Sequence, residues 1–276
     1  MKYINLILLI FTVSALQALQ LKNPDANTLW LEDGKDIKLT DKSKFYHWRA
    51  INVDVTSNAK GKGFSLKAQG KKSPKVLTGI KLHKDYPYLT FKINNLNMYQ
   101  GYCNLTFLIN GFFSSVQEAT PQKGIYVYDL YKNLPSKVET NLNRYLTIYL
   151  SNLKVNFEYL KIVKNPPYLV KVDCNTSEIK PGSKVKFTAY LAEEAEDVSI
   201  SLIANGVPRS IKVNGKLKIQ LKVVDKTQKI WAAEVEIKNI GIKKALSRHK
   251  VFLKTDILGG ELDEPVFVSL PYSIAP

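Results

Sequence analysis

Several aromatic side chains of this sequence stand beside polar ones in turn-like segments. Flat rings stack on the apolar C–H faces of sugars, while neighbouring polar groups bind the sugar hydroxyls. The pattern therefore predicts a carbohydrate-binding site in the first part of the chain. Packing in a core or at a sheet edge is the competing interpretation for each ring. Six residues in turn-like segments are the candidates: Trp48, Arg49, Tyr99, Tyr102, Phe112 and Phe113.

The motifs of common enzyme active sites are absent from the sequence. There is no HExxH segment among the 3 histidines, no Gly-x-Ser-x-Gly elbow and no complete glycine-rich phosphate loop. The 2 cysteines, Cys103 and Cys174, do not have zinc-site spacing, and two free thiols are the preferred interpretation over a disulfide. We therefore predict no catalytic residues, no metal site and no cofactor.

Alternation of apolar and polar residues runs through the chain and predicts the elements that would position such a site. A period of two places alternate side chains on a buried and an exposed face, as in antiparallel β-sheets. No window of ten or more residues shows the period of an amphipathic helix. The predicted fold class is therefore all-β. The alternating segments are 89–93, 105–107, 125–128, 146–150, 157–162, 185–187, 198–202, 217–223, 235–237, 251–253 and 266–268.

Asparagine and glycine residues supply the predicted turns between these strands. Both Asn205 with Gly206 and Asn214 with Gly215 are typical of type I′ hairpin turns, since these residue types accept positive φ at low cost. The segment around Asn95 and Asn97 is interpreted as a turn as well.

A domain boundary is predicted at Asn165, Pro166 and Pro167. Two consecutive prolines cannot continue a central strand, because they lack backbone donors and have a fixed φ. The boundary divides the mature chain into residues 19–165 and residues 166–276. The sizes of the two parts predict an eight-stranded jelly-roll followed by an immunoglobulin-like sandwich.

Particular segments of both parts carry a resemblance to known families. With Trp48 and residues 64–67, 86–93 and 157–162, the first part resembles the galactose-binding-like jelly-rolls that many carbohydrate-binding modules use. With residues 168–187, the second part looks like a bacterial immunoglobulin-like domain. The resemblance implies two antiparallel β-sandwiches, but it transfers no individual ligand residue, and similarity of fold does not imply function.

The N-terminal residues 1–18 have the features of a signal peptide. Lys2 precedes an apolar run over residues 4–13 that is too short for a stable membrane span, and Ala15 and Ala18 suit a signal peptidase. A retained anchor is the alternative. No other apolar stretch has the length of a transmembrane segment. We therefore expect a secreted, periplasmic or cell-surface protein.

The formal net charge of +16 is unevenly distributed along the chain. Residues 19–165 contain 22 basic and 11 acidic residues, a net charge of +11, whereas residues 166–276 contain 17 and 13, a net charge of +4. A basic surface attracts polyanions. A lysine-rich composition that reflects an AT-rich genome is the alternative explanation. Only 4 basic residues are arginines, the side chain best suited to phosphate, and export argues against nucleic acid as a partner.

These observations together predict an exported, non-catalytic glycan-binding protein. The jelly-roll would bind a polysaccharide or cell-surface glycan, with an acidic one among the candidates, and the second sandwich would act as a spacer or as a contact for a protein partner. One alternative is a structural or adhesive assembly protein that uses exposed strand edges. A second alternative is a hydrolase whose site has no recognisable motif.

Overall fold

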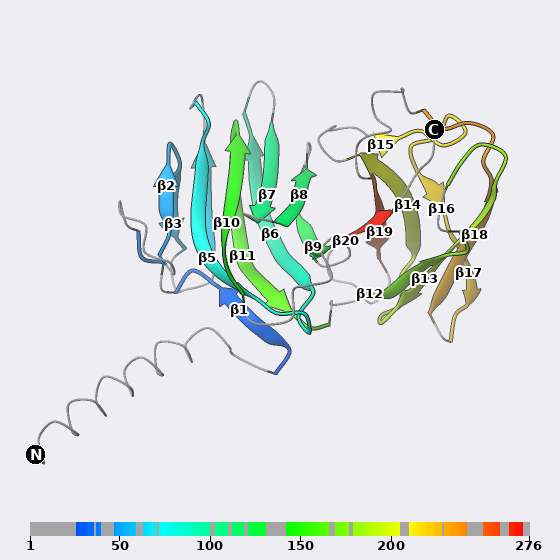
Figure 1. Ribbon diagram of the computed structural model, residues 1–276, viewed down its shortest axis with the longest axis horizontal. Coiled ribbons are helices and arrows are strands. Elements are labelled where there is room, and N and C mark those ends of the chain that lie inside the picture. Colours follow the sequence, from blue (N-terminus) through cyan, green and yellow to red (C-terminus); the bar gives the residue numbers. More distant parts are fainter. Residues whose placement is uncertain are drawn as a thin grey trace, which may run out of the picture.

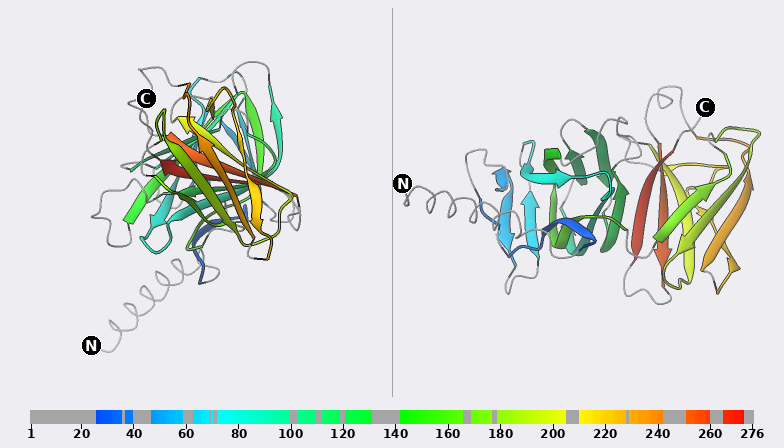
Figure 2. Two further views of the ribbon diagram at one scale, coloured as in Figure 1. Left: turned by 90° about the vertical axis from the view of Figure 1, so that its right-hand side faces the viewer. Right: turned by 60° about the horizontal axis from the view of Figure 1, so that its bottom comes forward.

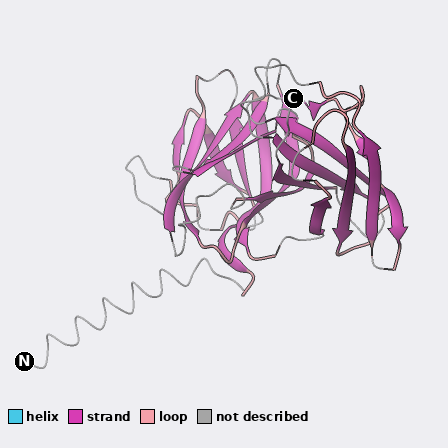
Figure 3. Cartoon of the chain, turned by 45° about the vertical axis from the view of Figure 1, so that its right-hand side comes forward, coloured by secondary structure: helices cyan, strands magenta, loops and turns pink. Residues whose placement is uncertain are grey.

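A computed structural model describes most of the chain from residue 26 onward. The described residues consist of strands, turns and loops and include no helix, which confirms the all-β prediction for this part (Figure 3). None of these residues therefore forms a helix that could cross a membrane. The predicted signal peptide, residues 1–18, lies outside them. The described ranges are 26–35, 37–39, 47–58, 63–68, 70, 72–99, 103–109, 112–118, 121–130, 142–165, 169–176, 179–204, 210–227, 229–241, 251–259 and 265–272.

A central sheet of 11 strands runs through both halves of the molecule (Figure 1). Its strand order is β15-β14-β19-β20-β9-β6-β11-β4-β3, with β1 also paired to β11 and β16 also paired to β14. The strands are β1 (Thr28–Glu32), β3 (Asp54–Ser57), β4 (Phe64–Ala68), β6 (Tyr88–Met98), β9 (Gly124–Asp129), β11 (Leu153–Val163), β14 (Asp197–Ala204), β15 (Ser210–Ile211), β16 (Ile219–Gln220), β19 (Val251–Leu258) and β20 (Val266–Tyr272).

Two smaller sheets pack on this central sheet and complete two β-sandwiches (Figure 2). The five-stranded sheet has the order β2 (Arg49–Ile51), β5 (Lys75–Leu82), β10 (Leu142–Ser151), β7 (Asn104–Ile109) and β8 (Phe112–Glu118). The four-stranded sheet has the order β12 (Leu169–Cys174), β13 (Lys184–Leu191), β18 (Ile230–Glu236) and β17 (Lys222–Asp225).

The two halves are joined by hydrogen-bonded pairing between β9 and β20. This pairing is parallel, with Phe267 beside Tyr126, whereas the other described strand pairs are antiparallel. Along β9, Tyr126 and Tyr128 face the core under the five-stranded sheet, while Ile125 and Val127 face the core under the four-stranded sheet. Successive strand residues point to opposite faces, so the two outer sheets cover opposite faces of the central sheet at this strand.

Apolar alternation explains most of the strands. In β7 the burial alternates residue by residue, with Leu105, Phe107 and Ile109 in the core. The turn predicted at Asn95 and Asn97 was wrong, because both residues lie inside β6. The register between β6 and β11 shifts beside Asn95 and Phe157, so the asparagines accompany a β-bulge rather than a chain reversal.

The predicted strand 217–223 is divided in the structure. Residues 219–220 form β16 and pair with the central sheet, whereas residues 222–225 form β17 and pair with the four-stranded sheet. Between them, Leu221 is buried and its backbone N–H donates to the Val198 carbonyl at 2.9 Å. Alternation of apolar residues continues through the crossing, so the pattern alone did not show the change of sheet.

The type I′ turn predicted at Asn214 and Gly215 agrees with their backbone, since φ is 51° and 81° respectively. Asn205 and Gly206 lie outside the described residues. The predicted boundary at 165–167 falls between β11 and β12, and its assignment as a domain boundary stays a prediction. The jelly-roll and immunoglobulin-like labels also stay predictions, whereas the β-sandwich architecture is shown.

Candidate functional site

Trp48 is a core residue, so its prediction as a sugar-stacking ring has to be corrected. Its side chain is 1% exposed, and its ring centroid lies 5.3 Å from that of Phe64. The indole N–H donates to the Glu32 carboxylate at 2.8 Å. A ring enclosed in this way offers no face to a ligand, and its polar atom is already satisfied by a buried acid.

Of the other five candidates, the structure describes the side chains of Arg49 and Tyr99. Arg49 is exposed on β2. Half-buried Tyr99 follows β6, where its backbone N–H donates to Asn152 and its carbonyl accepts from the Cys103 thiol. Tyr102 lies outside the described residues, as do the side chains of Phe112 and Phe113, whose backbone belongs to β8. Their assignments as ligand residues stay predictions.

The outer face of the five-stranded sheet combines aromatic, basic and amide side chains. We call this surface the tyrosine platform. It includes Arg49, Lys75, Lys81, Asn104, Thr106, Tyr145 and Tyr149, together with Leu77, Leu108 and the buried Thr147 between the two tyrosines. The sheet is an outer layer of the molecule, so this face is turned away from the central sheet (Figure 1).

Burial on the inner face fixes which side chains form the platform. On β10, Leu146, Ile148 and Leu150 are fully buried in the core. Because side chains alternate along a strand, Tyr145 and Tyr149 must point outward. Both are half-buried, and four residues of strand separate them by about 13 Å. The rings of Tyr145 and Tyr149 therefore both lie on the outer face of β10, the central strand of this sheet.

Strand register brings polar groups beside each tyrosine. Tyr149 lies between Lys75 of β5 and Thr106 of β7. The Lys75 ammonium is 5.7 Å from the Tyr149 ring centroid, within the range of a cation–π contact. Thr106 exchanges hydrogen bonds with the neighbouring Asn104 side chain at 2.9 and 3.1 Å. Opposite Tyr145 is Gly79, which contributes no side chain to the surface.

The platform is electrostatically positive. Arg49, Lys75 and Lys81 belong to it, and the described outward-facing residues of β2, β5, β7 and β10 include no aspartate or glutamate. A sheet face with two rings, several cations and short polar side chains can stack on sugar rings and neutralise carboxylate or sulfate groups. Among the described residues, it offers no acid for general acid–base catalysis.

Sequence reasoning missed Tyr145 and Tyr149 because it searched turns rather than strand faces. The detectable feature was a tyrosine at a polar position of the alternating segment 146–150, Tyr149, and a second one, Tyr145, directly before that segment. Elsewhere in the part of the chain that the structure describes, no group of three or more His, Cys, Asp or Glu side chains could hold a metal ion. Cys103 and Cys174 are both free thiols.

Comparisons with known proteins give no family for the chain. A scan of protein families and a search of curated proteins find no match. Among solved structures, a DUF4785 family protein from Legionella pneumophila is 10% identical with a TM-score of 0.31, covering 85% of this chain and 65% of that one. The β-glucuronidase of Bifidobacterium dentium is 8% identical with a TM-score of 0.27, covering 72% and 39%.

A third solved structure that is similar over part of its length is the glycoside hydrolase domain of Endo-D from Streptococcus pneumoniae R6. It is 8% identical with a TM-score of 0.28, and the match covers 83% of this chain and 37% of that one. The chain thus spans less than two thirds of these proteins. Likenesses at this level carry no argument about function, which has to come from the site itself.

Proposed function

We propose that this chain is an exported, non-catalytic glycan-binding protein that binds an acidic polysaccharide on the tyrosine platform. Export is part of the proposal and depends on the signal-peptide pattern of residues 1–18. The observation that carries the binding role is the pairing of an outward-facing ring, Tyr149, with the Lys75 ammonium on a sheet face free of described acids.

The chemistry of the platform favours an acidic over a neutral glycan. The rings of Tyr145 and Tyr149 supply apolar faces for sugar rings, and their spacing of about 13 Å suits an extended oligosaccharide. The cations Arg49, Lys75 and Lys81 would pair with uronate or sulfate groups, and Asn104 with Thr106 would hydrogen-bond to hydroxyls. The four-stranded sheet would then serve as a spacer or as a contact for a partner.

The experiment is binding of the purified chain to neutral, uronate-containing and sulfated polysaccharides at two salt concentrations. We expect retention by uronate or sulfated chains that weakens with salt but persists, because stacking is not screened. Tyr149→Ala should lower affinity about tenfold, equivalent to about 1.4 kcal/mol. Tyr149→Phe should retain most of the affinity, since the aromatic face remains.

A matched control exists on the central sheet. There the Lys161 ammonium lies 4.6 Å from the ring centroid of half-buried Tyr159, a second tyrosine–lysine pair away from the platform. Tyr159→Ala should leave glycan affinity unchanged. Retention that disappears with salt and is unchanged by Tyr149→Ala would show nonspecific charge attraction and contradict the proposal. Equal losses of affinity in Tyr149→Ala and Tyr159→Ala would contradict it as well.

A further inference from the structure

The change of sheet at Leu221 leaves part of one strand edge open. Strand β17 covers only the beginning of β18, because its register pairs Lys222 with Ala232 and Asp225 with Ile230. The chain before Leu221 belongs instead to the central sheet through β16. Within the described residues, the segment of β18 that follows Ala232 therefore has β13 on one side and no strand on the other.

Hydrogen bonds near the end of β18 show which backbone groups face this open edge. Ile237 donates its N–H to Ser183 at 2.9 Å and accepts from Gly182 at 2.7 Å, so both of its groups face β13. The Glu236 carbonyl faces the opposite way and accepts from the Asn214 amide at 2.7 Å. Because backbone groups alternate along a strand, the N–H and C=O of Glu234 face the open edge.

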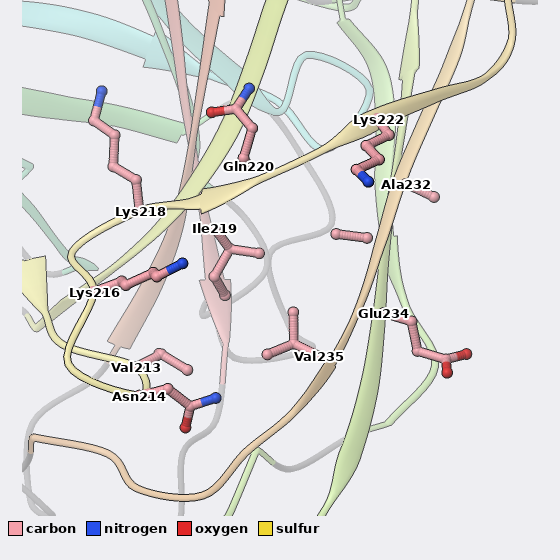
Figure 4. Close-up of a pocket in the computed structure, with 11 residues that line it drawn as sticks. Val213, Asn214, Lys216, Lys218, Ile219, Gln220, Lys222, Ala232, Glu234 and Val235 are labelled. Atoms are coloured by element: carbon pink, nitrogen blue, oxygen red, sulfur yellow. The ribbon is translucent and has the colours of Figure 1, made fainter.

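A hollow of about 510 Å³ lies beside this edge, within the usual size range of ligand sites. Figure 4 shows its two walls, with residues 213–222 on one side and β18 on the other. The side chains of Ile219 and Val235 point into the space between the walls, whereas the Glu234 carboxylate points away from it (Figure 4). The floor is aliphatic and contains no aromatic ring.

The rim of the hollow is basic. Lys216 and Lys222 are exposed, and no ion pair involving either is found in the part of the chain that the structure describes. Lys218 is bound to the buried Asp256 carboxylate at 2.8 Å. The rim's one acid, Glu234, hydrogen-bonds to Lys184 and raises the pKa of that lysine above its usual value. Two cations therefore remain for a ligand.

We propose that this hollow binds a short extended acidic segment of a partner protein as an added strand on β18. The Glu234 backbone would exchange two hydrogen bonds with the segment, as in other strand-addition complexes. Lys216 and Lys222 would pair with its acidic side chains, and its small apolar side chains would enter the hollow. From Ala232 to Glu236 the edge spans about 13 Å, which limits the added strand to three or four residues.

The open backbone edge favours a peptide over a glycan here. A strand edge presents a donor and an acceptor at the spacing of another strand, whereas a sugar has no matching repeat. The hollow also lacks the aromatic faces that distinguish the tyrosine platform. The two proposed sites thus differ in chemistry, and the test of one does not depend on the other.

The experiment is titration of the full chain with the peptide acetyl-Glu-Val-Glu-Val-Glu-amide, followed by calorimetry and by hydrogen exchange of the Glu234 amide. We expect saturable binding and slower exchange of that amide. Methylation of the central peptide nitrogens should weaken binding about tenfold by removing backbone donors. The lysine analogue acetyl-Lys-Val-Lys-Val-Lys-amide should not bind, because the rim is positive.

Charge reversal at the rim provides the matched variants. The double variant Lys216→Glu, Lys222→Glu should lose binding about tenfold, while Lys212→Glu, an exposed lysine that does not line the hollow, should retain it. Unchanged thermal unfolding of both variants shows that they remain folded. Equal binding of the methylated peptide overturns the proposal, and so does unchanged peptide binding by the Lys216→Glu, Lys222→Glu double variant.

Discussion

The cores on the two faces of the central sheet are built from different side chains. The core under the five-stranded sheet, here called the aromatic core, contains a cluster of rings among aliphatic side chains. Phe91 lies within this cluster, with ring centroids 4.4 Å from Phe107 and 4.9 Å from Tyr126. Under the four-stranded sheet the core consists mainly of valine, isoleucine and leucine, and its buried aromatic residues among the described side chains are Phe187 and Trp231. Both cores fill the space between two sheets, but in the first an aromatic cluster packs ring against ring, whereas the second is almost entirely aliphatic among the described side chains.

Strand β9 is where the two kinds of core meet. Its tyrosines contribute to the aromatic core and its aliphatic residues to the other, and Phe267 of β20 crosses to the aromatic side. Because β9 is buried on both faces, its loss from one core would also expose the other core to water. We therefore infer that the two sandwiches lose their structure together rather than as independent units.

The largest expected effect comes from truncating the aromatic core. Phe91→Ala removes a fully buried ring with several stacking partners and should lower the free energy of unfolding by about 3–5 kcal/mol. Ile200→Val in the aliphatic core removes one methylene and should cost about 0.5–1.5 kcal/mol. Urea unfolding monitored by fluorescence measures both.

The number of unfolding transitions in the same experiment tests whether β9 couples the two sandwiches. Both variants should shift one common transition, because β9 and β20 connect the cores. Two separate transitions, of which Phe91→Ala moves only one, would show that the sandwiches unfold independently. Similar costs for the two variants would contradict the expectation that the Phe91 ring contributes more to stability than one methylene of the aliphatic core.

A smaller effect is expected from removing the polar atom of a buried tryptophan. Trp48→Phe deletes the donor to Glu32, a carboxylate that is 3% exposed and that also accepts from the Gly34 N–H. The cost should be about 2 kcal/mol, because a buried acceptor loses a partner. Guanidinium unfolding measures this cost.

The matched change in the other core is Trp231→Phe. Trp231 is 7% exposed, and no hydrogen bond between it and a carboxylate is found among the described residues. Its replacement should cost about 1 kcal/mol, from the lost volume alone. Equal costs for the two tryptophans would mean that the Glu32 bond adds little to stability.

Local alternation of apolar and polar residues predicted the strands. It did not predict pairing between strands that are far apart in the sequence. The fully apolar run Ile125, Tyr126, Val127 and Tyr128 was interpreted as a strand with one buried face. A short run without polar positions is instead typical of a strand that is covered on both sides. The pairing of β9 with β20, which lies far along the sequence, could not be predicted, because no local pattern encodes it.

The candidate site was predicted less well than the fold, for a related reason. Arg49 was identified and lies on the proposed platform, but Trp48 beside it points into the core, since neighbours in a strand face opposite sides. Tyr145 and Tyr149 come from a strand that the sequence already indicated. What the sequence lacked was the register that places Lys75 and Thr106 next to Tyr149.

The smallest effect concerns the turn that holds the edge of the aliphatic sandwich. Asn214 adopts φ of 51°, and its side chain bonds to Glu236, Lys238 and Asn239. Asn214→Gly keeps the favoured φ and loses only these bonds, at an expected cost of about 0.5–1 kcal/mol. Asn214→Ala should cost about 1 kcal/mol more, because alanine disfavours the left-handed region. Thermal unfolding measures both.

The relative stability costs of Asn214→Gly and Asn214→Ala separate the contribution of the left-handed conformation from that of the hydrogen bonds. If alanine and glycine cost the same, the left-handed conformation contributes nothing, and the turn is held by its hydrogen bonds alone. If glycine costs nothing, the bonds to the end of β18 are dispensable, and the open edge beside Glu234 is maintained by the four-stranded sheet itself. Because Asn214 lines the hollow and donates to the Glu236 carbonyl, Asn214→Ala should also weaken acidic-peptide binding.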